Sequence, residues 1–319
     1  MPARLPLELE LVILELVILE LANDSHYSLG RIYPERVALL RRLALVHRDW
    51  TPWAQGRLFE QVFVFVCSPM FRGKEYSRGM KRLFRQIQLA TKYGRPLQRM
   101  VLDGNRDDGV SNHHLAIVRQ RCPDLREAVL VEFLVYPFFA TTFPALKRIK
   151  IQGCHNFRTS LDFSALPLTL EHLTLVHVVA SAFTVPLPLL HTLIIVSTYF
   201  APPANFLSNH PRLRSLALLK PAAYPFGAAV LSRTTQLENL LLHQSSPETL
   251  RGIVPVILPI LSQPSFRCFT WAAREDPTTE QEEAMLPVEV ACRNAQKRLV
   301  RLPYWVYHEE HFDEKWGAA

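Results

Sequence analysis

The middle of this chain repeats one spacing of large apolar residues, and that spacing limits the folds open to it. A leucine or equivalent residue is followed three and five residues later by two more, in an LxxLxL pattern that occurs eight times. The eight patterns follow one another at steps of 20 to 29 residues and begin at Leu97, Leu125, Leu146, Leu170, Leu190, Leu213, Leu237 and Phe266. A unit of this length holds one short strand and buries its apolar side only by stacking on the next unit. The sequence therefore predicts stacked units with parallel strands.

The spacing resembles that of leucine-rich repeats, which run about 20–29 residues per unit. The expected fold is an α/β solenoid, an irregular leucine-rich-repeat array of about eight units over residues 97–272. Two of the segments between strands, 112–120 and 248–261, are expected to be helical. In five units a proline stands two residues before the first leucine, where it fixes φ and is expected to end the preceding helix. These prolines are Pro123, Pro144, Pro188, Pro211 and Pro264.

Side chains alternate between the two faces of a strand, so the third and fifth positions of each motif point away from the predicted core. This face is charged in the early units and small or apolar in the later ones. Open sheet faces in solenoids are often binding surfaces, although a merely solvated face is the alternative. The candidate substrate-binding residues are Arg99, Glu127, Arg148, Lys150, His172, Thr174 and Thr192. Among them the three cations would suit an acidic or phosphorylated segment.

Residues 1–66 carry a second, aperiodic pattern. LPLELELVIL begins at Leu5, LALVHRDW runs from Leu43 to Trp50, and LFEQVFV begins at Leu58. This order resembles the small all-helical F-box-like domains of large fungal protein families, and an F-box followed by leucine-rich repeats is a familiar architecture. The block departs from the family pattern at His47, where a cysteine is usual, and in an insert over 23–34. The pentapeptide LVILE also occurs twice in succession from Leu11, so the first helix has no clean polar face.

The resemblance implies that the protein tethers other proteins and does not catalyse a reaction itself. F-box proteins dock on the Skp-type adaptor of a cullin–RING ubiquitin ligase, and their second domain holds a protein substrate at high effective concentration. Matching the motif implies adaptor-binding roles for Leu5, Pro6, Ile13, Leu45, Val46 and Trp50. The alternative for each of these residues is that it fills the core of the small domain. The expected function is that of a substrate-recognition subunit of an SCF-type (Skp–cullin–F-box) ligase. The alternative is a protein-binding scaffold whose N-terminal block only caps the repeats.

Two further regions complete the predicted organisation. Residues 67–96 are expected to form a linking amphipathic helix, and residues 67–150 hold 16 basic against 7 acidic side chains. A basic patch suits an acidic partner, but no recognised nucleic-acid module accompanies it. Residues 273–319 are expected to contain a capping helix after Pro287, with Val288, Cys292 and Leu299 on one stripe. The aromatic and acidic tail from Tyr304 to Trp316 is expected either to fold back on the body or to bind a partner.

Composition and motif searches argue against an enzyme. The 319 residues include only 11 glycines, and no glycine-rich phosphate loop or GxSxG motif occurs. The acidic run from Asp103 lacks the spacing of a calcium loop, and His308 and His311 lack the spacing of a zinc-protease helix. We therefore expect no catalytic centre, no cofactor and no metal. The five cysteines show no CxxC spacing, and neither a signal peptide nor a membrane span is evident. These features favour a cytoplasmic and/or nuclear location.

Overall fold

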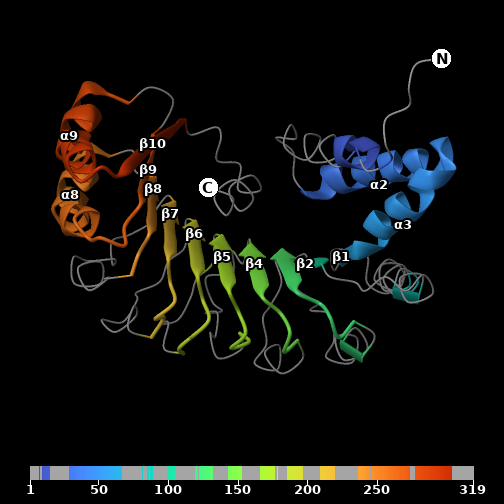
Figure 1. Ribbon diagram of the computed structural model, residues 1–319. Helices are drawn as coiled ribbons and strands as arrows, with labels where there is room; N and C mark the ends of the chain where they lie inside the picture. Colours follow the sequence, from blue (N-terminus) through green and yellow to red (C-terminus); the bar gives the residue numbers. More distant parts are fainter. Residues whose placement is uncertain are drawn as a thin grey trace, which may run out of the picture.

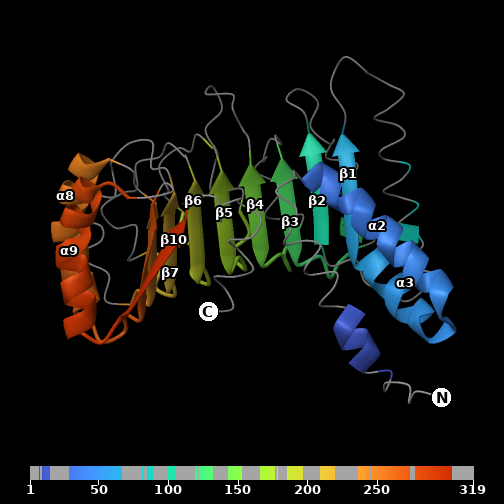
Figure 2. The same cartoon turned by 90° about the horizontal axis from the view of Figure 1, so that it is seen from above.

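The computed structural model of this protein describes residues 7, 9–14, 29–66, 81, 85, 87–88, 99–104, 119–120, 122–131, 143–152, 166–176, 178, 185–196, 209–219, 236–243, 246–273 and 277–303. Ten strands within these ranges form one sheet in sequence order, β1 to β10, and each pairs in parallel with the next. Figures 1 and 2 show the strands as one curved row with the labelled helices at its two ends. This α/β arrangement is compatible with a solenoid.

Eight of the strands begin at the third residue of the eight predicted motifs, so the strand prediction is confirmed. They are β2 (Arg99–Gly104), β3 (Glu127–Val131), β4 (Arg148–Gln152), β5 (His172–Val176), β6 (Thr192–Val196), β7 (Ser215–Leu219), β8 (Asn239–His243) and β9 (Cys268–Ala273). Equivalent motif positions pair across the sheet: Leu173 is opposite Leu193, which is opposite Leu216. The motif therefore sets the strand register.

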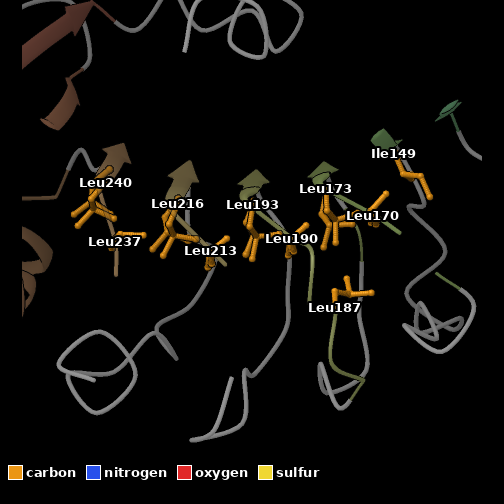
Figure 3. Packing of buried hydrophobic residues seen from close by; sticks show 14 of the residues in the cluster. Ile149, Leu170, Leu173, Leu187, Leu190, Leu193, Leu213, Leu216, Leu237 and Leu240 are labelled. Atoms are coloured by element: carbon orange, nitrogen blue, oxygen red, sulfur yellow. The ribbon is translucent and has the colours of Figure 1, made fainter. Parts of the chain in front are cut away.

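The motif leucines form the main core on one side of the sheet. Leu173, Leu193, Leu216 and Leu240 are fully buried, and the first residue of each neighbouring motif packs beside them in the same cluster. Figure 3 shows these side chains projecting from successive strands to the same side. Full burial stabilises each leucine by about 1.5–3 kcal/mol relative to an exposed one. Because each unit supplies one layer, the core is continuous from β2 to β9.

A tight turn precedes the repeat strands β3 to β7 and β9, and the predicted prolines lie in these turns. The first motif leucine donates its N–H to the carbonyl three residues earlier, as in Leu125 to Cys122 at 3.3 Å and Leu213 to His210 at 3.0 Å. Pro123 and Pro211 occupy the second position of these turns, where their fixed φ is favourable. These prolines form the corner that directs the chain into the strand. The helix over residues 247–261 ends shortly before Pro264, as predicted.

A ladder of backbone hydrogen bonds links successive units just before the strands. The carbonyl of Arg126 accepts the N–H groups of both Lys147 and Arg148, at 2.8 and 2.9 Å. The same double acceptance recurs at the carbonyls of Lys147, Glu171, His191, Arg214 and Glu238. The ladder satisfies backbone groups that would otherwise be left unpaired at the start of each strand. Side chains add ion pairs along it, including Lys147–Glu171 at 2.7 Å and Arg267–Glu238 at 3.3 Å.

Two strands lie outside the predicted repeat region. β1 (Gln61–Val66) falls within the block 1–66, which was expected to be a helical domain with Phe59, Val62 and Val64 as a candidate strand at its end, and it pairs with β2. Its alternation of Val62, Val64 and Val66 with phenylalanine is typical of a strand. β10 (Arg298–Pro303) lies beyond residue 272, in the expected cap, and pairs with β9. The LxxLxL pattern is not recognisable at β10, because Arg301 stands at the position of a buried aliphatic residue. Its guanidinium lies 5.8 Å from the ring centre of Trp271.

Helices occupy both ends of the sheet. α2 (Leu29–Val46), the 3₁₀ turn η1 (Arg48–Trp50) and α3 (Thr51–Glu60) precede β1, and α8 (Pro247–Leu261) matches the helix expected at 248–261. α9 (Thr279–Asn294) begins before the expected position at Pro287 because Thr278 and Gln281 form a capping box. Residues 81, 85, 87 and 88 of the linking segment are helical, and Ile87 joins the core. None of the described helices is long and apolar enough to cross a membrane.

Candidate protein-binding surfaces

The helical residues 9–14 carry apolar side chains on two opposite faces. Leu11 and Leu14, three apart, are half-buried, whereas Leu9, Val12 and Ile13 are exposed. Residues three and four apart share one face of a helix, so the exposed three form one continuous apolar strip. About half of the Ile13 surface, 47%, is accessible to solvent. A helix that is apolar on both faces is usually packed on both sides. The exposed strip is therefore suited to contact with a partner protein.

A polar contact anchors this helix to the rest of the N-terminal block. The indole Nε1 of Trp50 donates to Oε2 of Glu10 at 2.9 Å, and both side chains are partly buried. The imidazole of His47 lies against the Trp50 ring with centroids 5.7 Å apart, and its Nδ1 accepts the N–H of Asp49 at 3.2 Å. The Thr51 hydroxyl donates to the carbonyl of Ala44 at 2.7 Å. These bonds hold the corner between α2 and α3, and the Trp50–Glu10 bond attaches the first helix to it.

Leu45 and Val46 lie at the end of α2, on the side away from the small core of this block. That core consists of Leu40 and Ala54 with Leu43, Trp53 and Leu58 around them. The exposed fraction is 88% for Leu45 and 66% for Val46. Such exposure of two adjacent large aliphatic residues is what a docking surface requires, and it rules out a core-filling role for either residue.

The structure thus separates the predicted adaptor-binding residues into three groups. Ile13, Leu45 and Val46 are exposed on the N-terminal block, and Trp50 is half-buried and holds Glu10. Leu5 and Pro6 lie outside the described residues. Glu10 itself was not among the predicted residues, because its partner Trp50 lies forty residues away and no local pattern connects the two.

The second candidate surface is the sheet face opposite the leucine core. Arg99, Glu127, Arg148, His172 and Thr192 are aligned by the strand pairing into one lateral row, which continues through Ser215, Asn239 and Cys268. We call this the first row. Arg148 is exposed, and Glu127, His172 and Thr192 are half-buried. Arg99 is placed in the row by its backbone on β2. The predicted face residues at this position therefore lie side by side.

From β3 to β9, the described side chains at the next two outward positions of the strands are buried, which corrects the expectation for two predicted residues. Lys150 and Thr174, which pair with each other at the first of these two positions, are exposed by only 7% and 6%. Further along the same face, Val176, Ile194, Val196, Ala217, Leu219 and Leu241 form an apolar cluster separate from the leucine core, and each is exposed by 5% or less. We call these six residues the apolar patch. Among the described outward side chains of β3 to β9, those accessible to solvent are therefore in the first row.

Charge on the first row is set by its neighbours. Burial lowers the pKa of His172 to about 4, and the positive charges of Arg148 and His191 lower it further, against the opposing effect of Glu171. The hydrogen bond from Lys147 lowers the pKa of Glu171, and this effect is opposed by burial. At neutral pH the row therefore presents a neutral imidazole at His172, beside the Arg148 side chain.

No family model matches the chain, and no curated protein matches it. Within the described ranges, no group of three His, Cys, Asp or Glu side chains could hold a metal ion. The arrangement of the two surfaces is suited to binding macromolecules, one through exposed aliphatic side chains and the other through a charged row.

Proposed function

We propose that this protein is the substrate-recognition subunit of an SCF-type ubiquitin ligase. In this proposal the N-terminal block is an F-box-like domain that docks on a Skp-type adaptor. The ten-stranded sheet is an irregular leucine-rich-repeat array that holds a protein substrate. In this proposal the chain catalyses no reaction itself, and its role would place it in the cytoplasm or nucleus.

The observation that carries the proposal is the exposed aliphatic surface of the N-terminal block. Leu9, Val12 and Ile13 on the first helix, and Leu45 and Val46 at the end of α2, are all solvent-exposed. The Trp50–Glu10 bond attaches the first helix to the corner that follows Val46. Burial of large aliphatic side chains at the centre of an interface supplies most of the binding energy in protein complexes. The amphipathic first helix of an F-box is expected to act in this way.

Tethering is the mechanism that this architecture supports. Because β1 follows α3 without an intervening residue and pairs with β2, the helical block is continuous with the sheet. A substrate held on the sheet would then stay at a restricted distance from whatever binds the helices. Restricted distance raises the effective concentration of the two bound proteins and makes transfer between them nearly intramolecular.

The same continuity favours the second candidate function, a binding scaffold without a ligase role. A helical block joined directly to the first strand also serves as an end cap, which stacked repeats need in order to shield their terminal core. An end cap alone, however, gains nothing from exposed aliphatic residues such as Leu45. The two functions therefore differ in whether that surface binds a partner.

Co-purification with a Skp-type adaptor tests the proposal. The wild-type chain is expected to form a one-to-one complex, and the double variant Ile13→Asp/Leu45→Asp is expected to lose it. Both side chains are exposed, so the variant is expected to fold, which circular dichroism checks. The matched control is Leu168→Asp, because Leu168 is similarly exposed but lies in the turn before β5. A folded wild-type chain that does not bind the adaptor would refute the ligase function and leave the scaffold.

A further inference from the structure

One face of α9 carries exposed side chains at the spacing of a helix that packs on another helix. Thr279, Glu283, Leu286, Val290 and Arg293 follow one another at alternating steps of four and three residues, and all five are exposed. Residues at these steps share one face of a helix. Leu286 and Val290 are exposed by 56% and 44%, although both are large aliphatic residues. We call these five residues the α9 seam; its centre is apolar and its ends are polar.

The opposite face of α9 is already packed within the chain. Ala284, Met285, Val288 and Cys292 are buried members of the leucine core. Figures 1 and 2 show α9 beside α8 at one end of the row of strands, with α2 and α3 at the other end. The α9 seam is therefore open to a partner at the end of the sheet, on the side of the helix that does not contribute to the core.

The α9 seam is complementary to itself. Leu286 and Val290 lie two residues on either side of Val288, and Glu283 and Arg293 lie five residues on either side of it. Two copies of α9 that pack antiparallel about Val288 therefore bring each Leu286 level with Val290 of the second copy. The same register brings each Glu283 level with the second copy's Arg293, and a two-fold axis makes both contacts twice. A parallel pair would instead place like charges together at both ends.

The charged ends of the α9 seam favour a second copy as the partner. Among the described residues, Glu282 and Glu289 both pair with Arg301, whereas neither Glu283 nor Arg293 forms an ion pair. Opposite charges across an interface fix its register. The helix dipoles act in the same direction, because antiparallel packing places the N-terminal end of each helix beside the C-terminal end of the other.

We propose that two copies of this chain associate through an antiparallel pair of α9 helices, with Leu286 and Val290 at the centre and a Glu283–Arg293 ion pair at each end. Few apolar residues contribute, so the interface is small and the association is weak, in the micromolar range. The N-terminal block lies at the other end of the sheet, so the dimer would carry two candidate adaptor-binding surfaces. Self-association does not depend on the ligase function.

Charge reversal in the full chain, followed by sedimentation velocity, tests the pairing. The wild-type chain is expected to show a reversible equilibrium between monomer and dimer. Glu283→Arg and Arg293→Glu should each weaken the dimer by about ten-fold or more, because each variant alone opposes like charges twice. An equimolar mixture of the two variants should recover the dimer, because each copy then supplies the charge that the other needs. The matched control Arg251→Glu reverses an exposed charge on α8 and should leave the dimer unchanged.

A second variant tests the apolar centre of the α9 seam. Leu286→Asp should abolish the dimer, whereas Leu168→Asp, at a similarly exposed position before β5, should not. Circular dichroism checks that each variant retains its fold. A wild-type chain that stays monomeric at every concentration, a dimer that charge reversal leaves intact, or a mixture that associates no better than either variant alone would overturn the proposal. These measurements involve no adaptor, so failure here is distinct from failure of the proposed function.

Discussion

The indole of Trp50 donates a hydrogen bond to the carboxylate of Glu10, 2.9 Å away, and so joins two helical segments forty residues apart. Trp50 is a residue of the F-box-like motif, and Glu10 lies on the partly buried side of the first helix. The bond explains how a short apolar helix keeps its strip of Leu9, Val12 and Ile13 directed away from the block. In the proposed function it positions the adaptor-binding surface without contacting the adaptor.

Removing the indole donor should loosen the first helix. Trp50→Phe keeps a ring against His47 but leaves the Glu10 carboxylate without this donor. A partly buried hydrogen bond to a charged group contributes about 1–2 kcal/mol, so local opening should become roughly ten-fold more frequent. Hydrogen exchange of the amides of residues 9–14 measures the effect. Glu10→Gln retains an acceptor and should show a smaller increase, and exchange that is equal in all three proteins would show that the bond does not hold the helix.

Truncating a motif leucine should strongly destabilise the sheet. Leu216 on β7 is fully buried in the leucine core, so Leu216→Ala leaves a cavity and should cost about 2–5 kcal/mol in the free energy of unfolding. Urea denaturation followed by circular dichroism measures the loss. Leu168→Ala removes the same atoms from an exposed position and should cost less than about 0.5 kcal/mol. Similar costs for the two variants would contradict the placement of Leu216 in the core.

Acid should destabilise the fold through His172. The pKa of His172 is about 4 in the folded chain, below its usual value of 6.5, because the imidazole is desolvated beside Arg148. Between these two values the unfolded chain binds a proton that the folded chain does not, so stability falls as pH drops from about 6.5 to about 4. Below about pH 4 both states are protonated and this contribution stays constant.

NMR titration of the His172 imidazole measures that shift directly. Arg148→Gln removes the neighbouring cation, so the pKa of His172 should rise while remaining below 6.5, since burial is the larger cause. His172→Gln should remove this part of the pH dependence of urea stability. An imidazole that titrates near 6.5 in the wild-type chain would show that His172 is not desolvated in the folded protein.

The start of α9 should depend on its capping box. Thr278 accepts the N–H of Gln281 at 3.3 Å, and the Gln281 side chain accepts the N–H of Thr278 at 2.8 Å. Thr278→Ala should cost about 1 kcal/mol and fray the first turn, whereas Thr278→Ser should preserve most of the stability. Hydrogen exchange in the first turn of α9 distinguishes them. Equal protection in the alanine and serine variants would mean that packing against α8 holds this end.

The repeat spacing was sufficient to place eight of the ten strands, since alternation and a fixed motif position determine strand, register and inward face together. It missed β10 because Arg301 stands where an aliphatic residue is usual and packs its charged group over Trp271 instead. It placed β1 in a helical block because the helices of that block and the strand follow one another without a break at Gln61. Local patterns identify the type of an element more easily than the sheet to which it belongs.

The candidate surfaces were predictable in part. The first-row residues are neighbours, as predicted, because the register is regular. Leu45 and Val46 are exposed, and their role in adaptor binding stays a prediction. The burial of Lys150 and Thr174 was not predictable, because alternation along a strand determines which face a side chain occupies and not how far that face is shielded from solvent. The Trp50–Glu10 pair was missed because its two residues lie forty positions apart in the sequence. Contacts between distant segments leave no periodic trace in a single sequence.

The ladder of carbonyls before the strands has a consequence for how such a chain can change over generations. Its donors and acceptors are main-chain groups, so residues as different as Arg126, Lys147, Glu171 and His191 hold successive positions equally well. Mutation can therefore alter these positions freely without separating the units. The side chains at these positions can diverge until related chains share little sequence similarity there, while the strands remain aligned.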